Sequence, residues 1–368
     1  MIQEEIVQAA EAVQEDLYAV LKTARHVFEG GAVAELLKLV DRERTLAIAG
    51  KLAAYIENNL PAAVERRNGL ADYRTNPYVL LTAATVMRLG DPERFASFLF
   101  NSKLYMALET SFGKSVEATL VGQYPAPSEA KWDDPAEKLA EFAELKGLKR
   151  QDRARRRTLS VWREIDKAVV HNGRRFLVSI KSGPNTINDT QVQAMTQAII
   201  DHHPKWLEES LKHSGVEGID IVVGLTYGTP RTTNNKDNQI LAKLLDHGFG
   251  EADRNIFPGA LIDASGKVRV YRVVGTDFWA FIGDPTTPSN KRQVFLEILL
   301  ALSQALSVGI SQAKIEERLA DRMGRLAVAL AKLTFPRGSL PNWIQESLNE
   351  EQLFWFATAL TAFFDEGI

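Results

Sequence analysis

The chain has 368 residues, 45% of them hydrophobic and 25% charged, which is the composition of a folded globular protein with two or three compact units. It contains no cysteine, so disulfides and thiolate zinc sites are excluded. A net charge of −3 does not favour nucleic-acid binding, so any DNA-binding surface must be a local basic patch. The acidic amino terminus precedes no apolar segment and no run is long enough to cross a bilayer, so we expect a cytoplasmic protein without membrane association.

Residues 1–108 are predicted to form a helical domain, because apolar residues recur there at helical spacing. Gly30-Gly31 and Asn76-Pro77 separate the expected helices. A helix that begins near Asp91 is expected to carry Glu109 and Glu117. A helical domain of this kind would serve dimerisation or frame bound DNA.

The most basic segment spans residues 146–157, where lysines and arginines accompany a single acid, Asp152. Cations in such a cluster bind DNA phosphates and add affinity without reading the base sequence. The candidates for these contacts are four arginines near the end of the segment: Arg153, Arg155, Arg156 and Arg157. The alternative is a solvated helix face with no ligand.

A β-hairpin is predicted over residues 167–181. Mostly β-forming residues fill positions 168–170 and 176–180, and Asn172-Gly173 between them favours a tight turn because both residues tolerate positive φ. With the turn centred there, Asp166 pairs near Ser179. Asp166, Ser179 and Lys181 then share one face, since side chains alternate along a strand, and positions 178 and 180 face the core.

An acid and a lysine at the end of a strand suggest phosphodiester chemistry. Cleavage of a phosphodiester needs a carboxylate to hold a divalent ion and a cation beside the attacking water, because negative charge builds on the phosphoryl oxygens. Asp166 and Lys181 supply one of each. The alternative is a surface salt bridge across the hairpin.

Asp166, followed after the hairpin by Ser179-Ile180-Lys181, resembles the Asp…(Asp/Glu)-X-Lys signature of the PD-(D/E)XK nuclease superfamily. The continuation Lys181-Ser182-Gly183-Pro184-Asn185-Thr186 is similar, more narrowly, to a branch of type II restriction endonucleases. This resemblance implies an α/β fold. A mixed β-sheet nuclease core of the restriction-endonuclease-like type is expected at 109–285, between large helical N- and C-terminal regions at 1–108 and 286–368.

The same resemblance implies a sequence-specific endonuclease for double-stranded DNA that leaves 5′-phosphate ends. It implies Mg²⁺ as cofactor, with Mn²⁺ as a substitute, and a prokaryotic homodimer acting on a palindromic or interrupted-palindromic site. Asp166 would hold the metal, with the Ile180 carbonyl as a further ligand. Lys181 would orient the water and offset charge at the phosphorus.

Two positions depart from the family pattern. Ile165 stands where proline is most frequent, and Ser179 stands where the second acid is expected. A serine oxygen is a poorer ligand for magnesium than a carboxylate, so another acid has to fill the gap, or Asp166, a carbonyl and water hold the ion. Glu117 is the first candidate, with Glu109 and Glu164 as alternatives. The other interpretation of Glu117 is an exposed helix carboxylate.

Downstream of the hairpin, a helix is predicted from about Asp189, interrupted at Pro204. The apolar run 219–225 is expected to be a strand at the centre of the sheet. Further strands are predicted at 268–274 and 278–282, and a single helix is predicted at 343–364.

Polar residues after two of the strands could contact DNA, because their side chains can bind phosphates or pair with the edges of bases. The alternative is an ordinary polar surface loop. The candidates in these stretches are Ser182, Asn185, Asn188, Arg231, Asn234, Asn235 and Lys236.

Two other functions remain open. One is a repair or recombination nuclease of the same superfamily, acting on structured or single-stranded DNA. The other is a catalytically silent DNA-binding protein, in which Ser179 marks the loss of the active site.

Overall fold

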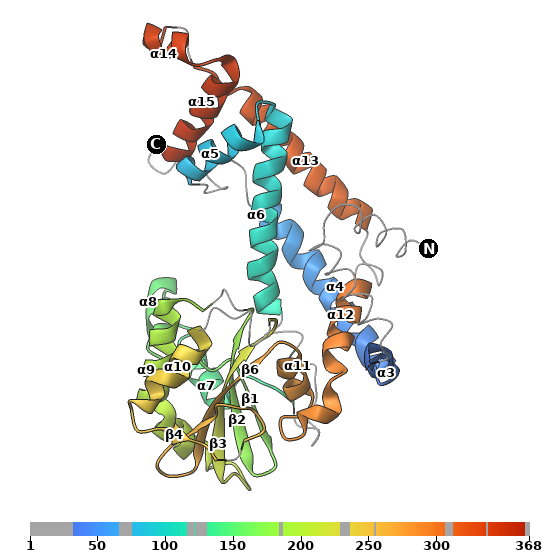
Figure 1. Cartoon of the computed structure of the whole chain (residues 1–368), viewed down its shortest axis with the longest axis vertical. Coiled ribbons are helices and arrows are strands. Elements are labelled where there is room, and N and C mark those ends of the chain that lie inside the picture. Colours follow the sequence, from blue (N-terminus) through green and yellow to red (C-terminus); the bar gives the residue numbers. More distant parts are fainter. Residues whose placement is uncertain are drawn as a thin grey trace, which may run out of the picture. The chain divides into compact units, whose positions relative to one another are not determined.

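The computed structural model describes residues 32–65, 76–115, 121, 131–183, 187–228, 236–253, 255–305, 312–335 and 338–364 (Figure 1). The chain divides into two compact units, each made of two separate stretches. The sheet unit comprises Met1–Ala49 and Val116–Ser303, and the helical unit comprises Gly50–Ser115 and Gln304–Ile368. The boundaries of these units differ from the expected stretches 1–108, 109–285 and 286–368. The reason is that helices from the amino-terminal and carboxyl-terminal parts of the chain share one core.

The helical unit contains part of α4 (Arg42–Glu65), and then α5 (Pro77–Met87), α6 (Pro92–Ser115), α13 (Gln312–Ala331), α14 (Asn342–Ser347) and α15 (Glu350–Phe364). Its core joins residues of α5 and α6 to residues of α13 and α15. The largest buried members are Phe95, Phe100 and Trp355, and Leu80, Leu99 and Leu330 pack with them. None of the described helices is long and apolar enough to cross a membrane.

The helix expected at 343–364 is two helices. Leu348 has extended backbone angles, φ −116° and ψ 132°, and ends α14. Asn349 then begins α15, since its side chain accepts a hydrogen bond from the Gln352 N–H (2.8 Å) and the Gln352 side chain accepts one from the Asn349 N–H (3.0 Å). This reciprocal capping box restarts the helix.

The described part of the sheet unit forms one six-stranded mixed sheet in the order β1-β2-β3-β6-β5-β4. The strands are β1 (Lys167–His171), β2 (Arg174–Lys181), β3 (Gly218–Leu225), β4 (Gly250–Glu251), β5 (Leu261–Ile262) and β6 (Val268–Val274). Neighbours β2, β3 and β6 are parallel, and the other pairs are antiparallel. The α/β class and the mixed sheet are confirmed.

The predicted hairpin is present as β1 and β2. Lys167 lies opposite Val178 and His171 opposite Arg174, so this register continues to Asp166 opposite Ser179. The turn residues Asn172 and Gly173 have φ of 47° and 74°. Both values lie in the left-handed region that Asn and Gly tolerate, which fixes the register.

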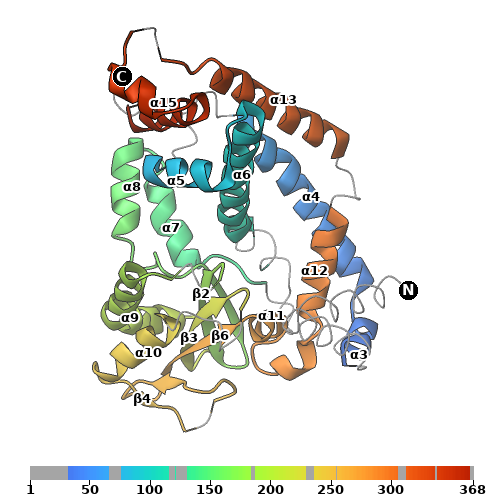
Figure 2. The ribbon, with the colours of Figure 1, turned by 45° about the horizontal axis from the view of Figure 1, so that its top comes forward.

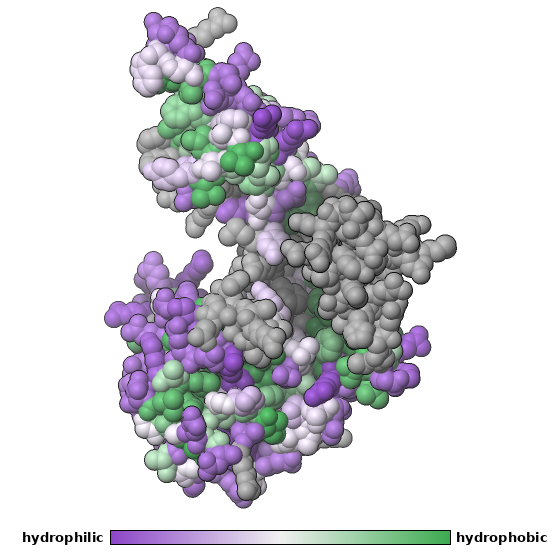
Figure 3. Space-filling view, in the orientation of Figure 1, coloured by the Kyte–Doolittle hydropathy of each residue, from purple (hydrophilic) through white to green (hydrophobic). Residues whose placement is uncertain are grey.

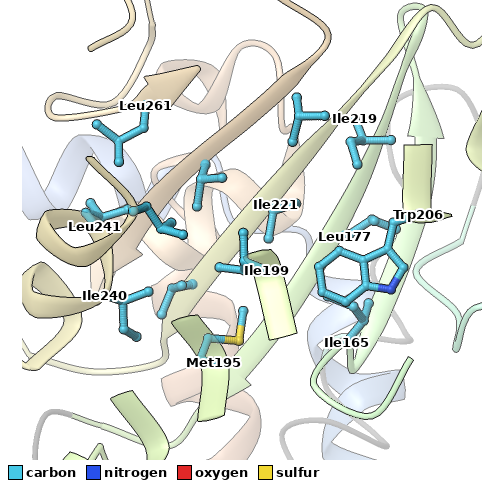
Figure 4. Packing of buried hydrophobic residues seen from close by; sticks show 14 of the residues in the cluster. Ile165, Leu177, Met195, Ile199, Trp206, Ile219, Ile221, Ile240, Leu241 and Leu261 are labelled. Atoms are coloured by element: carbon cyan, nitrogen blue, oxygen red, sulfur yellow. The ribbon is translucent and has the colours of Figure 1, made fainter. Parts of the chain in front are cut away.

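The sheet is covered by α9 (Asp189–Ser210) and α10 (Lys236–Leu245) on one face and by α11 (Thr276–Gly283) on the other (Figure 2). The core under α9 and α10 joins Ile165 and Leu177 to Ile199, Trp206 and Ile221 (Figure 4). β3 is buried along its whole length between β2 and β6, which confirms the predicted central strand. The helix expected to break at Pro204 is continuous from Asp189 to Ser210.

The strand predicted at 278–282 is wrong, because this stretch lies in helix α11. Gly275, with φ 61°, turns the chain at the end of β6, and a Cβ there would lie 2.2 Å from the Gly228 carbonyl oxygen. Residues 278–283 are all buried. A short run that is apolar on every side has no periodicity that could separate a strand from a helix.

The remaining helices of the sheet unit are α3 (Ala32–Lys38), α7 (Ala136–Glu144), α8 (Arg150–Thr158), the 3₁₀ helix η5 (Pro288–Lys291) and α12 (Val294–Ala305). Of these, α12 extends past the boundary of the unit, as α4 does. The others are short. The buried Glu297 of α12 accepts a hydrogen bond from the Asp41 N–H (3.2 Å), just before α4. This contact ties the amino-terminal part of the sheet unit to α12.

Candidate active site

Lys181, and Asp166 before β1, lie at the edge of the sheet where the parallel strands end. Lys181 ends β2, and its register partner Leu225 ends β3. Helices α9 and α10 begin next to this edge, and an ion pair between Lys236 and Asp189 joins their first residues. Ligands of open α/β sheets bind outside the carboxyl ends of the strands, so this edge is a suitable place for a site.

Asp166 is fixed immediately before β1. Its N–H donates to the Val178 carbonyl (2.8 Å), and its carboxylate Oδ2 accepts a hydrogen bond from the Ile180 N–H (2.6 Å). The side chain is therefore aimed at β2 and held there by a charge-assisted hydrogen bond. The Ile180 carbonyl faces the same way, because the N–H and C=O of one strand residue point toward the same neighbour.

Lys181 lies beside a different carboxylate. Its Nζ is 3.9 Å from Oε2 of Glu164, while Arg163 Nε is 3.4 Å from Oε1 of the same residue. The Lys181 and Glu164 side chains keep 20% and 16% of their surface exposed. The acid two residues before Asp166 therefore lies beside the lysine.

Ser179 faces the same side of the sheet as Asp166 but is fully buried. Its hydroxyl has no hydrogen-bond partner among the residues that the structure describes. A carboxylate is absent from this position, and of the three candidate replacements Glu164 lies beside Lys181. Glu117 lies outside the described residues, and Glu109 lies in α6 of the helical unit, where its side chain is not described.

The donor atoms at this edge are of the type that magnesium prefers. Asp166 and Glu164 supply carboxylate oxygens, and Ile180 supplies a carbonyl oxygen. Within the described ranges there is no group of three or more His, Cys, Asp or Glu residues that could hold a metal. A metal at this edge would therefore rest on two acids, one carbonyl and water.

The loop after Lys181 is tied to the end of β3. Thr226 donates from its N–H to the Lys181 carbonyl (3.0 Å) and from its Oγ1 to the Ser182 carbonyl (2.8 Å). A Cβ at Gly183 would lie 2.1 Å from the Tyr227 ring, so any other residue here would require the tyrosine side chain to move. Asn185 lies outside the described residues.

The segment before β1 that carries Glu164 and Asp166 is fixed by contacts with α7 and α9 that could not be predicted from the sequence. Lys138 of α7 donates to the Ile165 carbonyl (2.6 Å), and Trp206 of α9 donates to the Val161 carbonyl (3.0 Å). Arg175, buried to 3% exposure, lies 5.4 Å from the Trp162 ring and pairs with Glu137 through two contacts of 2.8 Å. In the sequence, only the position of an arginine within a run of β-forming residues indicates such a buried ion pair.

The pKa of Glu137 shows that these contacts favour the ionised form of its carboxyl group. Burial of the carboxyl group alone would raise its pKa, but hydrogen bonds and charge interaction with Arg175 outweigh it. The pKa of Glu137 is lowered to about 2.

The basic segment forms helix α8, within the sheet unit. Arg155, Arg156 and Arg157 are exposed in its last turns, and Arg153 is half-buried. The Arg157 guanidinium lies 4.9 Å from the Phe142 ring, which holds its stem against α7. Hydrophilic residues gather over this part of the sheet unit (Figure 3).

The other expected DNA contacts are placed in part. Asn188 is the N-cap of α9, where its Oδ1 accepts a hydrogen bond from the Gln191 N–H (2.9 Å), so its side chain has a structural role. Lys236 pairs with Asp189. Ser182 is half-buried at the end of β2, whereas Arg231, Asn234 and Asn235 lie outside the described residues.

Comparisons of the chain with models of protein families and with curated proteins find no match. The function therefore has to be argued from the site itself. Two carboxylates, a lysine and a carbonyl oxygen at one edge of a sheet can hold a hard cation and stabilise negative charge on a substrate.

Proposed function

We propose that this protein is a metal-dependent DNA endonuclease. The observation that carries the proposal is that Asp166 is bound to the Ile180 N–H while Glu164 lies beside Lys181, the last residue of the same strand. Phosphodiester hydrolysis needs groups of these two charges, because an anionic substrate must be neutralised while a water molecule attacks phosphorus.

Each residue has a role that its place on the strands supports. Asp166, Glu164 and the Ile180 carbonyl would hold Mg²⁺, or Mn²⁺ in its place. The bound ion supplies positive charge to the phosphoryl oxygens and lowers the pKa of a water ligand. Lys181 would orient the attacking water and offset the charge that develops at phosphorus. The buried Ser179 would contribute no carboxylate, and Glu164 would supply it instead.

The type of nuclease is proposed from the sequence. The run from Lys181 to Thr186 resembles type II restriction endonucleases, so we infer a homodimer that cuts a palindromic or interrupted-palindromic duplex site and leaves 5′ phosphates. The exposed arginines of α8 would contribute phosphate contacts that are independent of base sequence.

The test is digestion of plasmid and single-stranded DNA with the purified chain, in Mg²⁺, in Mn²⁺ and with a chelator. Discrete plasmid fragments with 5′-phosphate ends, lost on chelation, are expected. A smear, or a preference for single-stranded or structured DNA, would instead identify a repair or recombination nuclease. Cutting that persists in the chelator contradicts the proposed metal role.

A second candidate, a catalytically silent DNA-binding protein, is favoured by one observation. The position opposite Asp166 holds a buried serine whose hydroxyl has no partner among the described residues. Loss of a ligand there would leave the phosphate contacts and remove the chemistry. Salt-dependent DNA binding without cutting in either metal would support this candidate.

A further inference from the structure

A second group of charged residues lies at the opposite end of β2. Arg174 begins this strand and Lys181 ends it, so the two ends are separated by about 23 Å at the usual rise of a strand. Arg174, Phe176, Asp220, Ile256, Arg269 and Tyr271 line a pocket of about 490 Å³ there. We call it the Arg269 pocket. None of these residues belongs to the proposed nuclease site.

The acid of the Arg269 pocket is already paired. Asp220 accepts a hydrogen bond from Arg174 Nε (2.5 Å) and another from the Tyr271 hydroxyl (3.2 Å). Arg174 also donates from Nη2 to the Ile219 carbonyl (2.6 Å) and the Lys267 carbonyl (3.0 Å). Arg174 and Asp220 therefore satisfy each other, and burial raises the pKa of Asp220.

Gly218 makes this arrangement possible. A Cβ at Gly218 would lie 2.6 Å from Arg174 Nη1 and 2.5 Å from the Lys267 carbonyl oxygen. The guanidinium therefore lies across the start of β3, where any side chain would displace it. The pairing of Arg174 with Asp220 is thus built into the backbone of the pocket.

Arg269 is a cation in excess. It lies directly opposite Asp220 in the β3–β6 register, but Asp220 is paired with Arg174 and Tyr271. The Nε atom of Arg269 is buried and has no hydrogen-bond partner among the described residues. Two arginines and one aspartate leave the pocket with one positive charge, and a buried donor without a partner is destabilising until an acceptor binds it.

We propose that the Arg269 pocket binds a small organic anion. One carboxylate or phosphate group of the ligand would accept hydrogen bonds from Arg269, and an apolar or aromatic body would pack against Ile256, the exposed apolar residue of the lining. Guanidinium groups suit both kinds of acid because they present a planar fork of donors. The pocket volume lies within the range usual for small-molecule sites.

The test measures binding of phenyl phosphate and benzoate to the whole chain by calorimetry, with phenol as the neutral comparison. At least one of the two acids is expected to bind, and the stronger one identifies the acidic group. Phenol is expected to bind at least tenfold more weakly. Equal binding of phenol, or binding of neither acid at millimolar concentration, would overturn the proposal.

Two matched variants assign the binding to this pocket. Arg269→Gln removes the cation and is expected to lower the affinity for the acid at least tenfold. Lys267→Gln makes the same charge change at an exposed position two residues earlier and is expected to leave affinity unchanged. Equal weakening in both variants would show that only net charge matters and would contradict the proposal.

A second pair of variants keeps the test valid if Arg269→Gln fails to fold. Ile256 lines the pocket and is 54% exposed, so a polar residue there is compatible with folding. Ile256→Glu is expected to lower the affinity for the anion severalfold, and Ile256→Lys is expected to raise it. No difference between the two would overturn the proposal. DNA cutting is expected to stay unchanged in all these variants, which separates this test from the test of the nuclease.

Discussion

Strand β2 pairs a cation with a carboxylate near each end, and the two pairs differ in geometry. Arg175 and Glu137 form two contacts of 2.8 Å, with Arg175 3% exposed, whereas Lys181 and Glu164 are 3.9 Å apart and both partly exposed. The tight pair occupies both carboxylate oxygens of Glu137, and Ser210 and His213 add further contacts from within the chain. A longer, more open pair keeps charges available for a ligand. The comparison separates a structural ion pair from a candidate catalytic one.

The largest expected effect is on catalysis. Asp166→Ala removes the carboxylate that is bound to the Ile180 N–H. Lys181→Ala removes the cation beside Glu164. Each is expected to lower the rate of DNA cutting by about 10²–10³-fold or more, because charge stabilisation at the phosphorus is lost. Plasmid cleavage rates at saturating Mg²⁺ measure the effect, and Lys205→Ala, on the exposed side of α9, is the control.

The next effect is on stability and falls on the structural pair. Arg175→Met leaves Glu137 without its main partner and removes the contact with Trp162. We expect a loss of about 2–3 kcal/mol in the free energy of unfolding, since the Trp162 contact is lost and the partly exposed Glu137 keeps only His213 as a charged partner among the described residues. Urea denaturation measures it. A double variant, Arg175→Met with Glu137→Leu, is expected to recover part of the loss, and the absence of recovery would argue against the pairing.

Glu164→Gln sharpens the contrast between the pairs. The amide keeps the shape of the side chain but removes the charge near Lys181, so a higher Mg²⁺ concentration should be needed for cutting, by about tenfold. Glu144→Gln makes the same change at an exposed position on α7 and serves as the control. An unchanged Mg²⁺ requirement in Glu164→Gln would exclude this residue as a ligand.

The pH dependence of stability should report on Glu137. Its pKa is lowered from 4.5 to about 2 in the folded chain, so its contribution is fully present above about pH 4.5 and is lost as the pH falls toward 2. Because the Glu137 side chain is 20% exposed and its charge is partly screened, this contribution is expected to be about 1–2 kcal/mol. Urea midpoints between pH 6 and pH 3 for the wild-type chain and Glu137→Gln should converge as the pH falls. Parallel curves would contradict this assignment.

The smallest effect is expected from the arginines of α8. Arg155→Gln and Arg156→Gln each remove one exposed cation. If each contacts a phosphate, DNA affinity should fall modestly on every sequence and the slope of log K against log salt should change by about one per residue. Fluorescence anisotropy over a salt series measures the slope. An unchanged slope would assign α8 to a solvated face.

The local part of the fold could be predicted from the sequence because short-range rules decide it. Asn172-Gly173 fixes the hairpin and its register, and the apolar run of β3 marks the central strand. The stretch 278–282 was assigned wrongly, because burial on every side removes the periodicity that distinguishes helix from strand.

The site could be predicted only where strand geometry decides it. The placement of Asp166 opposite Ser179 followed from the turn. The approach of Glu164 to Lys181 depends on the turn at 161–164, which is set by contacts from α7 and α9 to Ile165 and Val161. Such long-range contacts leave no periodic signal in the chain.

The most direct measurement of the central claim compares three proteins in one assay. The wild-type chain, Asp166→Ala and Lys181→Ala are incubated with supercoiled plasmid and Mg²⁺, and near-ultraviolet circular dichroism checks that all three are folded. Discrete cutting by the wild-type chain alone is the predicted result. Equal cutting by all three, or none by the wild-type chain in Mg²⁺ or Mn²⁺, would contradict the account.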